Sequence, residues 1–256
     1  MNAFNAEEMT FHCRIQKTTL APDEARAYWA RWTPDVSKEA QAIRAFEERW
    51  FGARSAARVR VLLESLRARF DRFPEAFEVL RGWRGMDARV RGVICHWHLQ
   101  LSDPLYRGFT GDFLPARRSS GSGPLDRGQV LRWVAEVAPG RWGPSSRVQF
   151  ASKLMTAASE AGLLSPRRDP RSLLLPPVPD LALGYLLHLL AGIAFEGTLL
   201  QNPYVASVGL AGPQLEDRLR SLQGFSLRRL GDVVEFDREA SSLRDWAAVA
   251  LPGEAA

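Results

Sequence analysis

The sequence predicts a mostly α-helical protein, in which a helical N-terminal bundle is followed by a second helical unit that carries a small β-hairpin. Apolar residues recur at three- and four-residue spacing through most of the 256 residues, whereas the alternation typical of strands is sparse. Between residues 115 and 128, Ser, Gly and Pro cluster without any period, which indicates a linker. We therefore expect a helical domain over 1–117, a linker over 118–128, a second domain over 129–196 and an acidic C-terminal segment over 197–256.

Helices are expected wherever one face of the segment is apolar. They lie near residues 22–32, 36–51, 55–72, 74–82, 86–101, 127–138, 146–161, 180–195, 214–222 and 240–250. The segment 55–72 illustrates the pattern, because Val59, Leu63, Leu66 and Phe70 form an apolar stripe. On the polar face of this helix we expect Arg58, Arg69 and Arg72.

Composition favours an ordered cytoplasmic protein. Apolar residues make up 46% and charged residues 25% of the chain, as in ordinary globular proteins. Two cysteines are too few for a disulfide scaffold, and the N-terminus lacks the apolar stretch of a signal peptide. The apolar segment 181–195 is shorter than the about 20 residues that span a bilayer, so we predict a buried helix and no membrane contact.

Positive charge is concentrated in the middle of the chain. The formal net charge is +5, and the local balance is −1 over residues 1–50, +10 over 51–175 and −4 over 176–256. Only three of the 34 basic residues are lysines. Guanidinium groups suit contacts to phosphates and base edges, and a basic excess confined to one region is typical of a surface for a polyanion.

The segment after the linker predicts a helix, a turn, a second helix and a hairpin. Asp126 can cap a first helix that ends at Pro139 and Gly140. Ser145 or Ser146 can cap a second helix, and Gly162 fits a left-handed C-terminal cap. Leu163 and Leu164, a polar tip over residues 165–171 and then Ser172–Leu175 predict a small hairpin. This order is that of a winged helix-turn-helix-like unit with a packing helix behind it.

In such a unit the second helix enters the major groove of DNA, and the basic hairpin, or wing, lies on the backbone or in the minor groove. The candidate DNA-binding residues are Ser145, Ser146, Arg147, Gln149 and Lys153 on the helix and Arg167, Arg168 and Arg171 at the tip. Arg58, Arg69 and Arg72 form a competing basic face in the N-terminal domain. Arg and Gln can read base edges, while helix N-termini bind phosphate.

Motifs for catalysis are absent from the sequence. It contains no GxxxxGK[ST] phosphate-binding loop, no HExxH and no GxSxG. We therefore expect neither an enzyme nor a cofactor.

Two smaller features are open to more than one interpretation. Cys95 and His98 share a helical face and could join His12 and Cys13 as metal ligands, but we favour packing in a helical core, and predict no metal. Trp142 lies in the turn between two glycines. It could therefore rest on sugar-phosphate or on a partner protein.

Several short patterns resemble the BrxA family of BREX phage-defence systems over roughly residues 10–190. They are Thr18-Thr19-Leu20, the Arg-rich helix 54–69, the helix around Trp133, Ser146-Arg147, Ala161-Gly162-Leu163-Leu164, Arg171-Ser172-Leu173, Pro176 and Tyr185-Leu186-Leu187. The resemblance implies a small helical, non-catalytic accessory protein that binds double-stranded DNA beside other BREX defence proteins. The alternative is a protein-protein interaction scaffold, whose basic middle binds an acidic partner or this chain's own acidic C-terminal segment.

Overall fold

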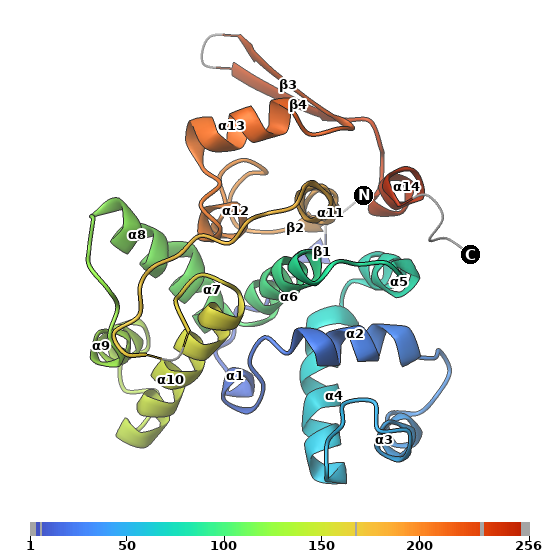
Figure 1. Ribbon diagram of the computed structural model, residues 1–256, viewed down its shortest axis with the longest axis vertical. Helices are drawn as coiled ribbons and strands as arrows, with labels where there is room; N and C mark the ends of the chain where they lie inside the picture. The colour runs from blue at the N-terminus through green and yellow to red at the C-terminus, as the bar shows by residue number, and fades with distance from the viewer. Residues whose placement is uncertain (1–3, 6, 167, 231–232, 252–256) are drawn as a thin grey trace.

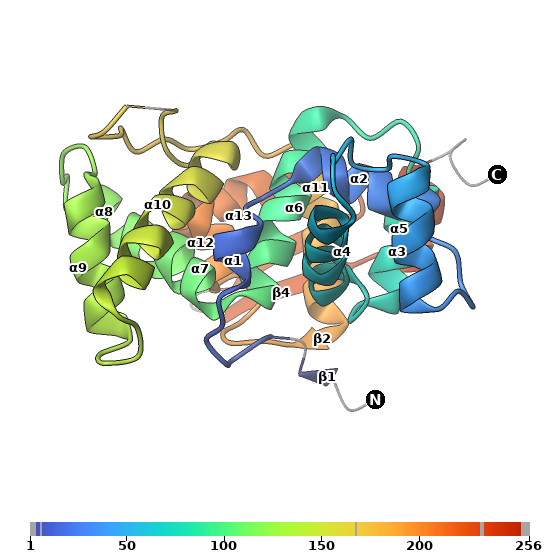
Figure 2. The same cartoon turned by 90° about the horizontal axis from the view of Figure 1, so that it is seen from below.

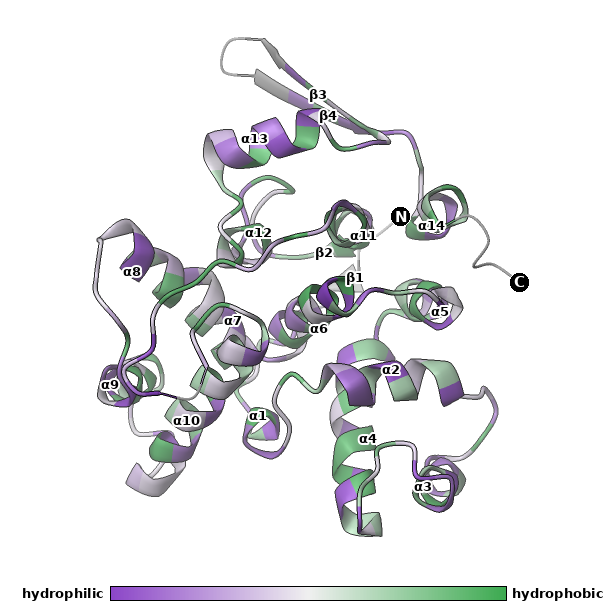
Figure 3. Ribbon diagram, viewed as in Figure 1, coloured by the Kyte–Doolittle hydropathy of each residue, from purple (hydrophilic) through white to green (hydrophobic). Residues whose placement is uncertain are grey.

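The fold is mostly helical, as predicted. The computed structural model describes residues 4–5, 7–166, 168–230 and 233–251 (Figure 1). Helices account for 59% of the chain, and a small two-stranded antiparallel sheet accompanies them. Figure 3 shows hydrophilic and hydrophobic residues on most helices, as expected for helices that bury one face.

The N-terminal helices surround a central one. They are α1 (Arg14–Lys17), α2 (Pro22–Arg31), α3 (Lys38–Glu47), α4 (Ala56–Phe70), α5 (Pro74–Gly82) and α6 (Ala88–Ser102). Both α2 and α4 pack on α6, whose residues 93–102 are all buried. The predicted stripe Val59, Leu63, Leu66 and Phe70 faces this core. Helix α1 was not predicted, because four residues are too few to display a period.

Regular structure extends beyond the expected start of the linker. Helix α7 (Pro104–Gly108) continues through a π-helical turn, η1 (Phe109–Phe113), into α8 (Leu114–Ser119). Pro115 lies in the first turn of α8, where its missing N–H costs no helical hydrogen bond. The irregular segment therefore begins only after Ser119, and the boundary expected at residue 118 falls inside a helix.

Two packed helices follow, α9 (Arg127–Val137) and α10 (Pro144–Glu160). The predicted cap at Asp126 is confirmed: its side chain accepts from Gln129 N at 2.8 Å, and Gln129 bonds back to Asp126 N. The predicted cap at Ser145 or Ser146 is wrong. Helix α10 begins at Pro144, whose fixed φ favours the first helical position, so both serines lie inside the first turn. Gly162 is left-handed, with φ of +76°, as predicted.

A short hairpin follows α10. Leu164 pairs with Leu173 in an antiparallel bridge, and Ser165 N donates to Ser172 O at 2.9 Å. A second bridge joins Leu125, just before α9, to Arg171 in the far arm, with both backbone hydrogen bonds at 2.8 Å. We call residues 125–174, bounded by this ladder, the α9–α10 unit.

The rest of the chain packs against the N-terminal bundle, and this includes the helix expected behind the winged unit, which packs on α6. Its elements are α11 (Asp180–Ala191), β2 (Ile193–Ala194), α12 (Pro203–Ser207), α13 (Gly212–Arg220), β3 (Phe225–Leu230), β4 (Val233–Arg238) and α14 (Leu243–Ala250), and β1 (Phe4–Asn5) pairs in parallel with β2. Helix α14 lies between α5 and α11, where Trp246 meets the ring of Trp83 at 6.1 Å. The β3–β4 hairpin was not predicted. Within the described residues, no helix is both long and apolar enough to cross a membrane.

One glycine is required for the close approach of two of these elements. A Cβ atom added at Gly111, in η1, would lie 2.4 Å from Cβ of Pro203 at the start of α12. Carbon atoms in contact are about 3.5–4.0 Å apart, so no larger residue fits at this position without movement of α12. This contact joins the α7–α8 segment to the C-terminal part of the chain.

Candidate nucleic-acid interface

The outward face of α10 carries uncharged polar side chains, with Val148 exposed beside them. Its inner face is made of Phe150, Ala151, Leu154 and other buried residues. A different set recurs at three- and four-residue spacing along the opposite side, and therefore lies on one line. This set, which we call the polar stripe, consists of Ser145, Gln149, Ser152 and Thr156, the first two exposed and the others half-buried.

The two cations of α10 differ in their relation to the polar stripe, which Lys153 borders, four residues after Gln149 and three before Thr156. Arg147 is half-buried, and its Nε donates to the carbonyl of Trp142 at 2.8 Å, which braces the turn before the helix. Lys153 is seven residues from both Ser146 and Glu160, so it shares their side of the helix. That side meets the N-terminal segment, since Gln16 Nε2 donates to Ser146 O at 3.3 Å.

The hairpin tip offers one described arginine to solvent. Arg168 is exposed. Arg171 is half-buried, and its Nη1 donates to Met155 O at 2.8 Å, so this side chain anchors the hairpin to α10. Its expected place at the exposed tip is therefore wrong, because the backbone bridge to Leu125 turns the side chain inward. Arg167 lies outside the described residues.

The competing basic face on α4 is not a single face. Arg69 is only 2% exposed, and its guanidinium donates to the carbonyls of Leu20, Thr18 and Thr19 and to Ser65 Oγ, at 2.6–3.1 Å. Its predicted exposure is wrong, because α4 is covered on that side by residues 18–20. Arg72 is half-buried and pairs with Glu8 at 3.6 Å. Arg58 alone of the three is exposed, with Nη1 donating to Lys17 O at 2.7 Å.

The four residues considered as metal ligands do not come together. His98 Nε2 lies 2.7 Å from the Tyr185 hydroxyl and Nδ1 lies 3.2 Å from Arg69 O, while Cys13 is exposed. Burial lowers the pKa of His98 to about 4 and raises the pKa of the Cys95 thiol to about 12. Among the described residues, no three His, Cys, Asp or Glu side chains are placed to hold a metal ion. The packing of Cys95 and His98 in the helical core is confirmed.

Trp142 is also part of the core. Its ring lies 4.2 Å from that of Phe150 and 5.7 Å from that of Phe11. With 9% of its surface exposed, it is not available to stack on a nucleic acid. The glycines around it had suggested exposure, but the ring folds back between α10 and the N-terminal segment.

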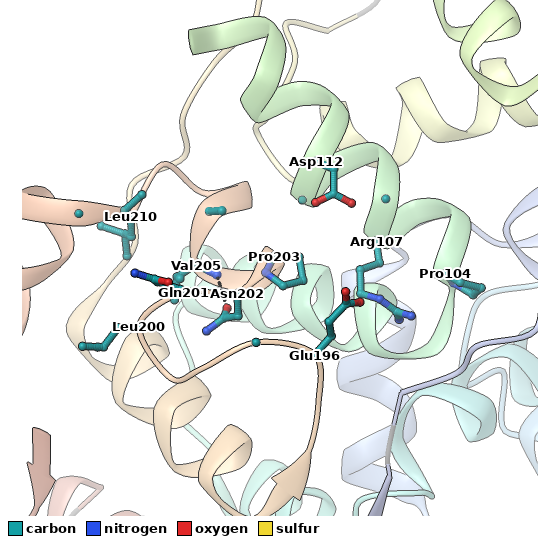
Figure 4. Close-up of a pocket in the computed structure, with 16 residues that line it drawn as sticks. Pro104, Arg107, Asp112, Glu196, Leu200, Gln201, Asn202, Pro203, Val205 and Leu210 are labelled. Atoms are coloured by element: carbon teal, nitrogen blue, oxygen red, sulfur yellow. Dashed lines mark hydrogen bonds between the residues drawn. The ribbon is translucent and has the colours of Figure 1, made fainter. Parts of the chain in front are cut away.

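A cavity of about 620 Å³ opens on another side of the molecule, between η1 and the loop before α12 (Figure 4). The carboxylates of Asp112 and Glu196 line it, and neither makes an ion pair with a described residue. Burial and the charge of Glu196 raise the pKa of Asp112. Two carboxylates repel phosphate, so this cavity is not part of a DNA-binding surface.

No protein-family model matches this chain, and no curated protein matches its sequence. The comparisons with known proteins therefore assign no function to the polar stripe or to the residues around it.

Proposed function

We propose that this chain is a non-catalytic accessory protein that binds duplex DNA through a winged helix-turn-helix formed by the α9–α10 unit. The observation that carries the proposal is the order of its backbone pairing. The residue before α9 pairs with the far arm of the hairpin that follows α10, and the two arms pair with each other. This connectivity is that of winged helix-turn-helix units, in which the second helix enters the major groove.

The polar stripe suits that groove. Serine, glutamine and threonine side chains are short donors and acceptors that can meet base edges without the cost of burying a charge. The first turn of α10 has no side-chain cap, so the backbone N–H groups of Ser145 and Ser146 are left to bind a phosphate, while Pro144 has none. Arg168 adds an exposed cation on the hairpin.

We further propose that the protein works in the cytoplasm beside other BREX defence proteins. The residues that carry the resemblance to the BrxA family include positions that build this fold. Gly162 ends α10, Arg171 ties the hairpin to α10, and residues 18–20 are held by Arg69. Because these residues shape the α9–α10 unit and the N-terminal segment packed against it, the resemblance favours a related architecture with a related role.

The wing and the stripe can be tested separately. Replacing Arg168 with alanine is expected to weaken binding to all duplex sequences alike, and to flatten the dependence of log K on log salt by about 0.9, one phosphate contact. Gln149→Ala should change the preference among sequences and leave the salt slope unchanged. Binding is measured by fluorescence anisotropy with labelled 20-bp duplexes.

The matched control is Arg228→Ala. Arg228 is exposed on β3, at the opposite end of the molecule from α10 (Figure 1), so its loss should leave the affinity for DNA unchanged. The proposed winged unit is wrong if the Arg168 and Gln149 variants both bind like the wild type.

A surface on α3 favours a second candidate function, the interaction scaffold. Ile43 is 49% exposed and Phe46 38% exposed, three residues apart on one face, and Val36 is exposed just before the helix. Apolar side chains grouped on a surface are typical of sites for protein partners. A chain that acts only as a scaffold leaves duplex DNA unbound even at low salt, which separates the two functions.

A further inference from the structure

The N-terminal segment runs beside α10 along its whole length. We call residues 11–20 the strap. In the turn before α10, Arg141 Nη2 donates to Phe11 O at 2.7 Å, and Gln16 Nε2 donates to Ser146 O in the first turn of the helix at 3.3 Å. At its end, the carboxylate of Glu160 accepts hydrogen bonds from the strap at residues 19 and 20, at 3.0 and 2.8 Å. The strap is therefore fixed against both ends of the proposed recognition helix.

Helix α4 joins the same surface through one arginine. Arg58 Nη1 donates to the carbonyl of Lys17, the last residue of α1 in the strap, at 2.7 Å. Figure 1 places α1 between α10 and α4, and Figure 2, seen from below, shows the three helices side by side. Arg58, the exposed member of the expected basic face of α4, therefore lies near the α9–α10 unit.

Two cations on this surface keep their charge available. Lys17 and Arg58 are both exposed, and neither makes an ion pair with a described residue. The carboxylates of Glu8 and Glu160 are each engaged by groups other than Lys17 and Arg58. Glu8 pairs with Arg14 and Arg72, both at 3.6 Å, and Glu160 accepts from the strap itself.

One of the two cations of α10 is engaged by the protein itself. Arg147 braces the turn through Trp142 O, whereas Lys153 is half-buried at the edge of the polar stripe, four residues after Gln149. Lys17 in the strap and Arg58 in α4 add further positive charge on this side of α10.

We propose that Lys17 and Arg58 bind phosphates of one DNA strand at the edge of the groove that α10 enters, so that the strap, α4 and the α9–α10 unit form one DNA-contacting surface. This inference rests on the proposed function. A helix in the major groove brings the flanking backbone within reach of neighbouring elements, whose phosphate contacts fix the register of the protein on the duplex. The bond to Lys17 O holds one edge of the Arg58 guanidinium, and its remaining N–H groups are left to grip a phosphate.

The test is a double variant, Lys17→Gln with Arg58→Gln, titrated onto a 20-bp duplex of mixed sequence at several KCl concentrations. We expect weaker binding to every sequence and a salt slope flatter by about 1.8, which is about 0.9 for each lost contact. Arg58→Lys retains the charge and is expected to keep the wild-type slope. Arg228→Gln is the matched control and should bind like the wild type.

The outcomes separate this inference from the proposed function. If the double variant keeps the wild-type affinity and slope while Arg168→Ala weakens binding, the strap surface is not a DNA contact and the winged unit stands. If Arg58→Lys loses as much of the slope as the double variant, the role of Arg58 as a phosphate ligand is overturned. If the wild type does not bind the duplex at low salt, both proposals fail. Thermal unfolding followed by circular dichroism should show equal midpoints for all variants, because the altered side chains are exposed.

Discussion

Replacing Arg69 with methionine is expected to lower the free energy of unfolding by about 3–5 kcal/mol. The guanidinium is buried and donates to three strap carbonyls and to Ser65 Oγ. Methionine has similar bulk but no donor, so these acceptors are left without a partner inside the protein. Each unsatisfied buried group costs about 1–3 kcal/mol, and water that reaches part of the site reduces the total. Urea unfolding followed by tryptophan fluorescence measures the change.

Arg60→Met is the matched control in the same helix. Arg60 pairs with Glu39 at 2.8 Å, but their side chains are 56% and 66% exposed. A surface ion pair contributes about 0–1 kcal/mol, so this variant should unfold close to the wild type. An equal loss of unfolding free energy in the two variants contradicts the role that we assign to Arg69, which is to hold residues 18–20 on α4.

The protein should lose about 4 kcal/mol of stability through His96 and His98 between pH 7.5 and pH 5. Burial lowers the pKa of His96 to about 3 and that of His98 to about 4, whereas an unfolded histidine has a pKa of about 6.5. Both histidines lie buried in α6, where His96 contacts the hydroxyls of Tyr106 and Ser207 and His98 that of Tyr185, so the folded state resists protonation.

The sign of the effect follows from linkage. Below pH 6.5 the two histidines bind protons in the unfolded chain but not in the folded chain, so stability falls as the pH falls. At pH 5 each histidine contributes a loss of about 2 kcal/mol. Asp103 acts in the opposite direction, because burial raises its pKa. The measurement is the free energy of unfolding at both pH values, for the wild type and for His98→Asn. The free energy of unfolding of the variant should fall less between pH 7.5 and pH 5. A wild-type stability that is equal at the two pH values contradicts the assignment.

Local signals in the sequence predicted the longer helices and two of their ends. Amphipathic spacing located α2, α4, α5 and α6, while Asp126 and Gly162 marked the start of α9 and the end of α10. These features depend on neighbouring residues, which a sequence displays directly. The π-helical turn and α8 were not predicted, because glycine and proline commonly break helices. Here Gly111 allows the close approach of Pro203, and Pro115 occupies the first turn of α8.

The candidate site was harder to predict, because the role of an arginine depends on distant residues. Arg69 and Arg58 lie on the same helix, yet residues 18–20 bury the first and leave the second exposed. Arg171 looks like Arg168 in the sequence, but only Arg171 is turned toward Met155 by pairing with Leu125. Spacing alone does not show which arginines are buried and hydrogen-bonded inside the fold. Nor does it show that Arg58 lies beside α10.

The most direct test of the central claim is the titration of the wild-type chain onto a labelled 20-bp duplex at 50 and 200 mM KCl. With Lys17, Arg58 and Arg168 each binding one phosphate, the salt slope should be at least about 2.7. The affinity should then fall roughly 40-fold between the two conditions, for every sequence tested. An affinity that does not change with salt, or the absence of binding at 50 mM KCl, contradicts the proposal that this chain binds DNA through its exposed cations.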